Sequence, residues 1–364
     1  LLIALLLVGA ASSFAAKVDT LLVKSPSMNK DIKVVVVTPD AALGKKATAC
    51  PTVYLLHGFG GHAKTWIEIK PNLPQIADEK GIIFVCPDGS TSWYWDSPKD
   101  PSFRYETFVS SELVKYIDGH YKTITDRKGR AITGLSMGGH GGLWTAIRHK
   151  DTFGACGSTS GGVDIRPFPK NWDMAKRLGD YESNKEIWDT HTVINQIDKI
   201  QNGDLAIIFD CGEADFFIQV NKDLHNRLLE KKIDHDFITR PGGHTGEYWN
   251  NAIDYQILFF DKFHNIGNFF IGNKCSLYTN RFRCPLRVEQ HISFSKKLFC
   301  AIHIQNRSGI RTRSHRKCNP ARHICFDQTG DDIHRWTLGC NHQMNPRRSC
   351  QLCQSADGLS LIHI

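Results

Sequence analysis

The chain has 364 residues, 41% of them hydrophobic, and a net charge of +8. This length allows one large α/β domain or two smaller ones. Residues 265–364 carry 15 Lys and Arg against 5 Asp and Glu, whereas the preceding residues carry 30 against 32. The part before residue 265 is therefore not basic, and we expect no nucleic-acid partner for it.

Residues 1–16 form an apolar run that ends in small residues. The run is too short to span a bilayer, and Ser13-Phe14-Ala15 fits a small-x-small cleavage site. We interpret residues 1–16 as an N-terminally incomplete signal peptide and expect export to the periplasm or the cell exterior. The alternative is a buried strand or helix at a true N-terminus. No later stretch has the roughly eighteen apolar residues of a membrane helix, so we expect no stable membrane insertion.

Residues 17–264 alternate between strand and helix patterns. Short apolar or β-branched runs predict strands at 32–38, 53–56, 82–86, 130–133, 154–158, 205–209 and 235–239. Apolar residues at helical spacing predict helices at 108–121, 139–149, 217–229 and 247–263. The alternation predicts one α/β domain, in which helices cover both faces of a mostly parallel sheet.

Two features of this domain are less regular. The segment 163–202, with a helical-looking stretch at 184–200, does not fit the alternation, and we expect a lid or cap insertion near the site. Cys86, Cys156 and Cys211 lie in or beside strand patterns, where a lone cysteine is usually a small core residue. Export would permit disulfides, but the sequence does not pair them.

The sequence Gly134-Leu135-Ser136-Met137-Gly138 lies between the predicted strand at 130–133 and the predicted helix at 139–149. A G-x-S-x-G between a strand and a helix is the nucleophile elbow of the α/β-hydrolase fold. The glycines permit a tight turn that lifts the Ser136 hydroxyl clear of the sheet, beside the positive end of the helix. We therefore predict a serine hydrolase.

A serine hydroxyl needs a base, and the base needs an anion to orient it. In this fold the chain order is Ser, then Asp or Glu, then His. We predict Asp215, just past the strand at 205–209, as the acid; Asp210 and Glu213 are nearby alternatives. We predict His244, on a glycine-rich loop before the last helix, as the base.

The oxyanion formed on attack needs N–H donors already aimed at it. The backbone N–H of Met137 should supply one of them. The second should come from Phe59, with Gly58 as the alternative, in a His-Gly-x-Gly-Gly run that starts at His57. We also expect Gly58 to line the substrate position, and the side chain of His57 to stabilise the loop. An ordinary glycine-rich turn is the competing interpretation.

An aromatic run, Trp93-Tyr94-Trp95, follows the strand at 82–86, at the sheet edge where ligands bind. Trp93 and Trp95 either contact a sugar, acyl or phenolic group, or pack beneath the next helix. We expect Trp66 and Trp249, near the oxyanion loop and His244, to fill core space.

These motifs together resemble the family of α/β hydrolases called putative esterases. The resemblance covers about residues 17–264 and is carried by 55–61, 92–96, 132–139, 211–215 and Gly243-His244. The family includes esterase D (S-formylglutathione hydrolase), tributyrin esterases, feruloyl and acetyl-xylan esterases, and mycolyl transferase antigens. The resemblance implies Ser136, Asp215 and His244 as the catalytic triad.

The resemblance and the signal-like start together predict a secreted serine esterase that acts on carboxylic esters. We expect short acyl or feruloyl groups on carbohydrates as substrates, whether small molecules or oligosaccharides, and no metal or cofactor. The alternatives are an S-formylglutathione hydrolase-like thioesterase and an acyltransferase of the mycolyl-transferase type.

Residues 265–364 show no sustained period and match nothing in this family. We interpret this tail as disordered or as a translation artefact. The alternatives are a small accessory domain and a zinc module around Cys340, His342, Cys350 and Cys353. Because only one C-x-x-C is present, the zinc pattern is weak.

Overall fold

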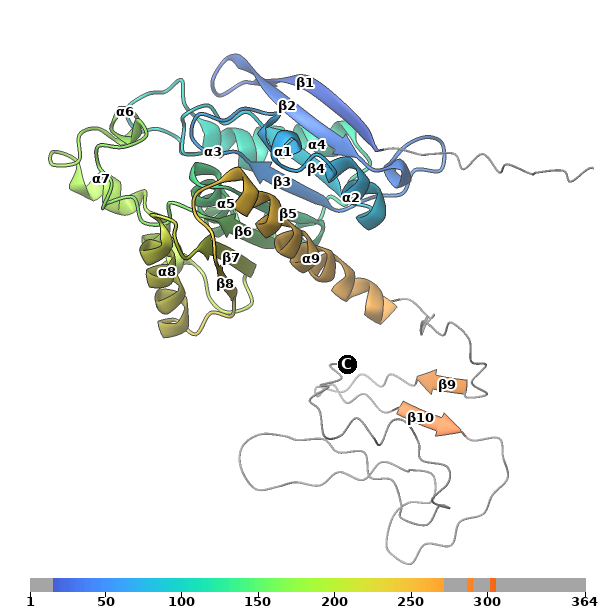
Figure 1. The fold of residues 1–364 in the computed structure, drawn as a ribbon. Coiled ribbons are helices and arrows are strands. Elements are labelled where there is room, and N and C mark those ends of the chain that lie inside the picture. Colours follow the sequence, from blue (N-terminus) through green and yellow to red (C-terminus); the bar gives the residue numbers. More distant parts are fainter. Residues whose placement is uncertain (1–15, 272–286, 291–301, 306–364) are drawn as a thin grey trace, which may run out of the picture. The chain divides into compact units, whose positions relative to one another are not determined.

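The structure is a computed structural model that describes residues 16–271, 287–290 and 302–305. Its first compact unit, residues 1–275, contains one eight-stranded sheet (Figure 1). The strands are β1 Lys17–Ser25, β2 Lys30–Thr38, β3 Thr52–Leu56, β4 Ile83–Pro87, β5 Arg130–Gly134, β6 Ala155–Thr159, β7 Ala206–Gly212 and β8 Asp236–Arg240.

The sheet has the order β1-β2-β4-β3-β5-β6-β7-β8. β1 and β2 pair antiparallel, and β2 is antiparallel to β4, whereas β4, β3, β5, β6, β7 and β8 run parallel. Every residue of β3, β4, β5 and β6 is buried, as expected for parallel strands with both faces covered. The predicted mostly parallel α/β architecture is confirmed.

Helices cover both faces of the sheet (Figure 1). The helices are α1 Thr65–Ile69, α2 Leu73–Lys80, α3 Tyr105–Thr107, α4 Leu113–His120, α5 Met137–Arg148, α6 Met174–Leu178, α7 Lys185–Thr190, α8 Ile218–Glu230 and α9 Gly246–Ile271. A π-helical segment, Phe108–Glu112, connects α3 to α4.

Two hydrophobic cores follow from the alternation of side chains along each strand. On one face, α4, α5 and α8 pack against side chains such as Val36 and Leu56. On the other face, α1, α2 and α9 pack against neighbours such as Val35 and Leu55. The adjacent residues of β2 and β3 thus point into opposite cores.

Several sequence expectations can be compared with these elements. The helix predicted to end at Phe263 continues as α9 to Ile271. The segment 163–202 contains α6, α7 and a 3-10 helix, Val193–Lys199, instead of one helix over 184–200. Cys86, Cys156 and Cys211 are free and buried, which confirms their assignment to the core.

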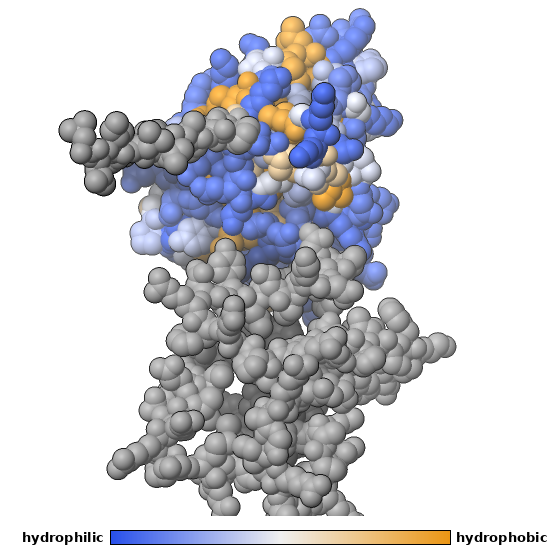
Figure 2. All heavy atoms as spheres, turned by 90° about the vertical axis from the view of Figure 1, so that its right-hand side faces the viewer, coloured by the Kyte–Doolittle hydropathy of each residue, from blue (hydrophilic) through white to orange (hydrophobic). Residues whose placement is uncertain are grey.

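The second unit, residues 276–364, is described at two strands, β9 Arg287–Gln290 and β10 Ile302–Gln305, which pair antiparallel. The signal-peptide interpretation falls on residues that, except for Ala16, are outside the described part. The cysteines and histidine of the possible zinc module also lie outside it. Of the helices in the described part, none is both long and apolar enough to cross a bilayer. The face seen in Figure 2 is mostly hydrophilic, with separate hydrophobic patches.

Candidate active site

Ser136 lies at the sharp turn between β5 and α5, at the carboxyl edge of the sheet. Its backbone has φ 56° and ψ −116°, a conformation that a residue with a side chain rarely adopts. The Ser136 N–H donates to Thr159 O at 3.0 Å, and the Leu135 N–H donates to Leu56 O at 3.1 Å. These bonds to the neighbouring strands β6 and β3 hold the strained turn in place.

The glycines of the motif are required by close backbone contacts. A Cβ at Gly134 would lie 2.5 Å from both the Gly138 carbonyl group and Leu56 O. A Cβ at Gly138 would overlap the backbone of Leu56 and His57. Because these neighbours are backbone atoms, they cannot move aside as a flexible side chain would. The turn can therefore bring α5 against β3 only with glycine at both positions.

Ser136, His244 and Asp215 lie in one hydrogen-bonded row. His244 follows β8, and its Nε2 lies 2.9 Å from Ser136 Oγ. Its Nδ1 lies 2.9 Å from Asp215 Oδ2, on the loop after β7. A carboxylate oxygen accepts, so Nδ1–H donates to Asp215 and leaves Nε2 to accept the Ser136 hydroxyl proton. The structure thus brings together the three side chains that sequence analysis selected.

The alternative acids are placed differently. Asp210 lies within β7 and is fully buried; its Oδ1 accepts from Thr159 Oγ1 and its Oδ2 from Gln256 Nε2, each at 2.7 Å. Burial raises the pKa of the Asp210 carboxyl. Glu213 is exposed and forms an ion pair with Lys222 at 2.8 Å. Asp210 therefore braces strands β6 and β7 against α9.

Asp215 itself is 2% exposed, and its Oδ1 accepts from the Phe217 N–H at 2.9 Å. This bond leaves Oδ2 for the imidazole and fixes the orientation of the carboxylate. Three aromatic rings flank the His244 ring, with centroid distances of 4.3 Å to Phe216, 5.0 Å to Trp249 and 5.6 Å to Phe217. Both partners of the Nδ1–Oδ2 bond are therefore held by their surroundings.

The glycine-rich loop after β3 lies against Ser136. A Cβ at Gly58 would approach the Ser136 Cβ to 3.2 Å, so the loop backbone passes directly beside the serine. The His57 side chain is buried: its Nδ1 donates to Gly58 O at 2.7 Å, and its Nε2 accepts from the Gly89 N–H at 2.8 Å. These bonds confirm the loop-stabilising interpretation of His57. The Phe59 ring is 37% exposed.

The aromatic run 93–95 lies inside the protein. Trp93 and Trp95 are at most 1% exposed, and their rings stack with centroids 5.6 Å apart. Both pack edge-on against His140, at 5.4 and 5.0 Å, and burial lowers the pKa of His140 to about 3. Trp66 is likewise buried, and its Nε1 donates to Leu56 O. The burial of Trp93 and Trp95 favours core packing over substrate contact.

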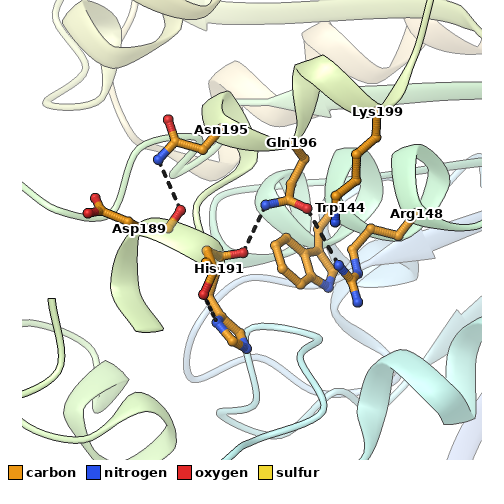
Figure 3. Close-up of a pocket in the computed structure, with 8 residues that line it drawn as sticks. Trp144, Arg148, Asp189, His191, Asn195, Gln196 and Lys199 are labelled. Atoms are coloured by element: carbon orange, nitrogen blue, oxygen red, sulfur yellow. Dashed lines mark hydrogen bonds between the residues drawn. The ribbon is translucent and has the colours of Figure 1, made fainter. Parts of the chain in front are cut away.

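A separate pocket of about 400 Å³ lies at the C-terminal end of α5 (Figure 3). Its lining consists of Trp144, Arg148, Asp189, Thr190, His191, Asn195, Gln196 and Lys199. Arg148 is the last residue of α5, and its Nε donates to Glu106 Oε1 at 2.7 Å. Trp144 and Arg148 lie about 10 and 17 Å along α5 from its first residue, Met137, so this pocket lies away from the Ser136 end of the helix. The lining contains no serine or cysteine.

Comparisons with known proteins point to ester hydrolysis. A family model described as "Putative esterase" matches residues 25–260. An acetyl esterase of Caldicellulosiruptor saccharolyticus is 26% identical over 217 residues, which cover 56% of this chain and 80% of that protein. The solved structure of a ferulic acid esterase aligns with a TM-score of 0.60 at 27% identity and covers 69% of this chain and 99% of that chain.

A third relative is named for a different activity. The diacylglycerol acyltransferase/mycolyltransferase Ag85B of Mycolicibacterium smegmatis is 30% identical over 194 residues, which cover 50% of this chain and 56% of that protein. The chain spans about half the length of this and several other curated relatives that it matches.

Proposed function

The chain belongs to this esterase family, which makes it a carboxylic-ester hydrolase, and from that premise we propose its catalytic residues and its class of substrate. Ser136 is the nucleophile, His244 the general base and then acid, and Asp215 the group that orients the imidazole. The observation that carries this proposal is the pair of 2.9 Å contacts that joins Ser136 Oγ, His244 and Asp215 Oδ2.

The reaction runs in two steps on this geometry. Ser136 Oγ attacks the ester carbonyl carbon while its proton passes to His244 Nε2. The resulting oxyanion accepts hydrogen bonds from the N–H groups of Met137 and Phe59, and the N-terminus of α5 adds a favourable dipole. When the tetrahedral intermediate collapses, Nε2 returns the proton to the departing alcohol. Water then cleaves the acyl-enzyme by the same route, with no metal or cofactor.

The substrates that we propose are short acyl or feruloyl esters of carbohydrates. The acetyl esterase and the ferulic acid esterase reported above support acetyl and feruloyl as the acyl groups, because these are the activities for which they are named. The apolar start of the sequence supports export to the periplasm or the cell exterior, where such glycans occur. The proposed partner is thus a small-molecule or oligosaccharide ester.

The experiment is a substrate panel run on the full chain and on Ser136→Ala. We expect the wild type to hydrolyse acetylated and feruloylated oligosaccharides faster than S-formylglutathione, and Ser136→Ala to hydrolyse none of them. Fast turnover of S-formylglutathione without turnover of the sugar esters would contradict the proposed substrate class. Undiminished hydrolysis by Ser136→Ala would contradict the proposed nucleophile.

Acyl transfer is a second candidate, favoured by the 30% identity to the mycolyltransferase Ag85B. The same acyl-enzyme would then react with an alcohol in place of water. Product analysis with added sugar acceptors separates the two reactions. Transfer to the sugar in excess of free acid would favour the transferase, and free acid as the main product would favour the hydrolase.

A further inference from the structure

Phe216, which lies beside His244, and Trp172, which stacks on Phe216, have no part in the proposed proton transfers. Phe216 is 49% exposed although its ring lies 4.3 Å from the imidazole, centroid to centroid. The partly exposed Trp172 ring stacks on Phe216, with centroids 5.6 Å apart and planes 21° from parallel. We call Trp172 and Phe216 the aromatic wall. An exposed apolar surface next to a reacting group is typical of a ligand contact.

The fold holds Trp172 in a conformation that is unfavourable on its own. Trp172 and Asp173 both have positive φ, 49° and 56°, which residues with side chains adopt rarely. Trp172 O accepts a hydrogen bond from the buried Trp93 Nε1–H at 3.1 Å. The rings of Phe168 and Phe217 pack on Trp172 with centroids 5.6 and 5.3 Å away. Strain that packing maintains in this way is concentrated at functional sites.

The proposed reaction decides which part of an ester meets the aromatic wall, and this step rests on the proposed function. The carbonyl oxygen points at the N–H groups of Met137 and Phe59. The leaving oxygen must lie where His244 Nε2 can protonate it. The alcohol portion therefore lies on the His244 side of Ser136, beside the aromatic wall, and the acyl portion extends away from it.

We propose that the aromatic wall binds the alcohol portion of the substrate and that this alcohol is a sugar ring. Pyranose rings combine an apolar C–H surface, which packs on aromatic side chains, with hydroxyl groups that need polar partners. Asp173, which follows Trp172 in the sequence, is partly exposed and forms an ion pair with Lys176 at 3.1 Å. We expect Asp173 to offer the sugar hydroxyl groups a polar partner that a simple aliphatic alcohol would not use.

The test compares two esters with the same acyl group, an acetylated xylo-oligosaccharide and ethyl acetate. The measured quantity is the ratio of their kcat/KM values, from acetate release. In Trp172→Leu we expect this ratio to fall about 3- to 10-fold, the size of one aromatic contact. Trp172→Phe keeps a ring and should keep most of the ratio. Leu22→Ala removes a 66% exposed apolar side chain on β1 and should not change it.

Several results would overturn the inference. An unchanged ratio in Trp172→Leu, or a wild type without preference for the sugar acetate, means that the wall does not bind the sugar. Methyl ferulate and methyl acetate differ only in the acyl group, so a selective loss on methyl ferulate would assign the wall to the acyl portion. A failure of the proposed function can be told apart from a failure of this inference. If Ser136 were not the nucleophile, Ser136→Ala would hydrolyse ethyl acetate as fast as the wild type.

Discussion

Gly58→Ala tests whether the loop after β3 is aimed at the reacting carbonyl. The added Cβ would meet Leu135 Cδ1 at 2.6 Å and the Ser136 Cβ at 3.2 Å. The Leu135 methyl can move, but the elbow backbone is fixed by its bonds to β3 and β6, so the loop must shift by a few tenths of an ångström. That shift moves the Phe59 N–H away from the oxyanion. Removal of a whole donor costs about 10²–10³ in kcat, and we expect a loss of about 10- to 100-fold.

The assay is steady-state hydrolysis of p-nitrophenyl acetate, with thermal unfolding as the check on folding. Gly119→Ala is the matched control, because a Cβ there meets nothing within 4 Å, and its kcat should equal that of the wild type. Leu135→Val in the Gly58→Ala background removes the nearest atom and should restore part of kcat. A Gly58→Ala protein with wild-type kcat would refute the assignment of this loop to the oxyanion.

Two further predictions concern charged groups. Asp215→Asn should lower kcat by about 10⁴-fold, because the imidazole loses its anionic partner and the tautomer that this partner fixes. Glu213→Gln is the control. If the two variants had equal kinetics, the role of Asp215 would be contradicted. Burial raises the pKa of Glu106, but hydrogen bonds from His149, Arg148 and Trp144 outweigh it and lower the pKa to about 2. Because the pKa of the Glu106 carboxyl is lower in the folded protein than its usual value of 4.5, the carboxylate stabilises the fold at any pH above 4.5. This contribution to the free energy of unfolding, about 3 kcal/mol, should disappear as the pH falls from about 4.5 to 2. In urea unfolding, Glu106→Gln should be less stable than the wild type at pH 7, and its free energy of unfolding should fall less as the pH is lowered. A pH profile of stability like that of the wild type would contradict the prediction.

Much of the fold could be predicted because the central strands are buried on both faces. Runs such as 53–56 and 82–86 are apolar throughout. The structure has β3 and β4 at these runs, and each observed strand end lies within one residue of the predicted end. β1 was not predicted, because its edge position leaves most of its residues exposed or half-buried and its sequence mixed. The short helices α1 and α2 were also missed. With five and eight residues, they are too short for a helical period to show in the sequence.

The candidate active site could also be predicted in part. Chain order and local context selected Ser136, Asp215 and His244, and the structure brings the three together. The sequence does not show which way an aromatic side chain on a loop points. Trp93 and Tyr94 have positive φ values of 56° and 60°, and both rings are buried. Phe216 was overlooked, although its place directly after the acid was a usable signal.

The most direct test of the account is the site of labelling by a fluorophosphonate, located by peptide mass spectrometry of the full chain. We predict one stoichiometric adduct on Ser136, which is lost in Ser136→Ala and forms much more slowly in His244→Ala. An adduct on another residue, or ester hydrolysis that persists after complete labelling, would contradict it.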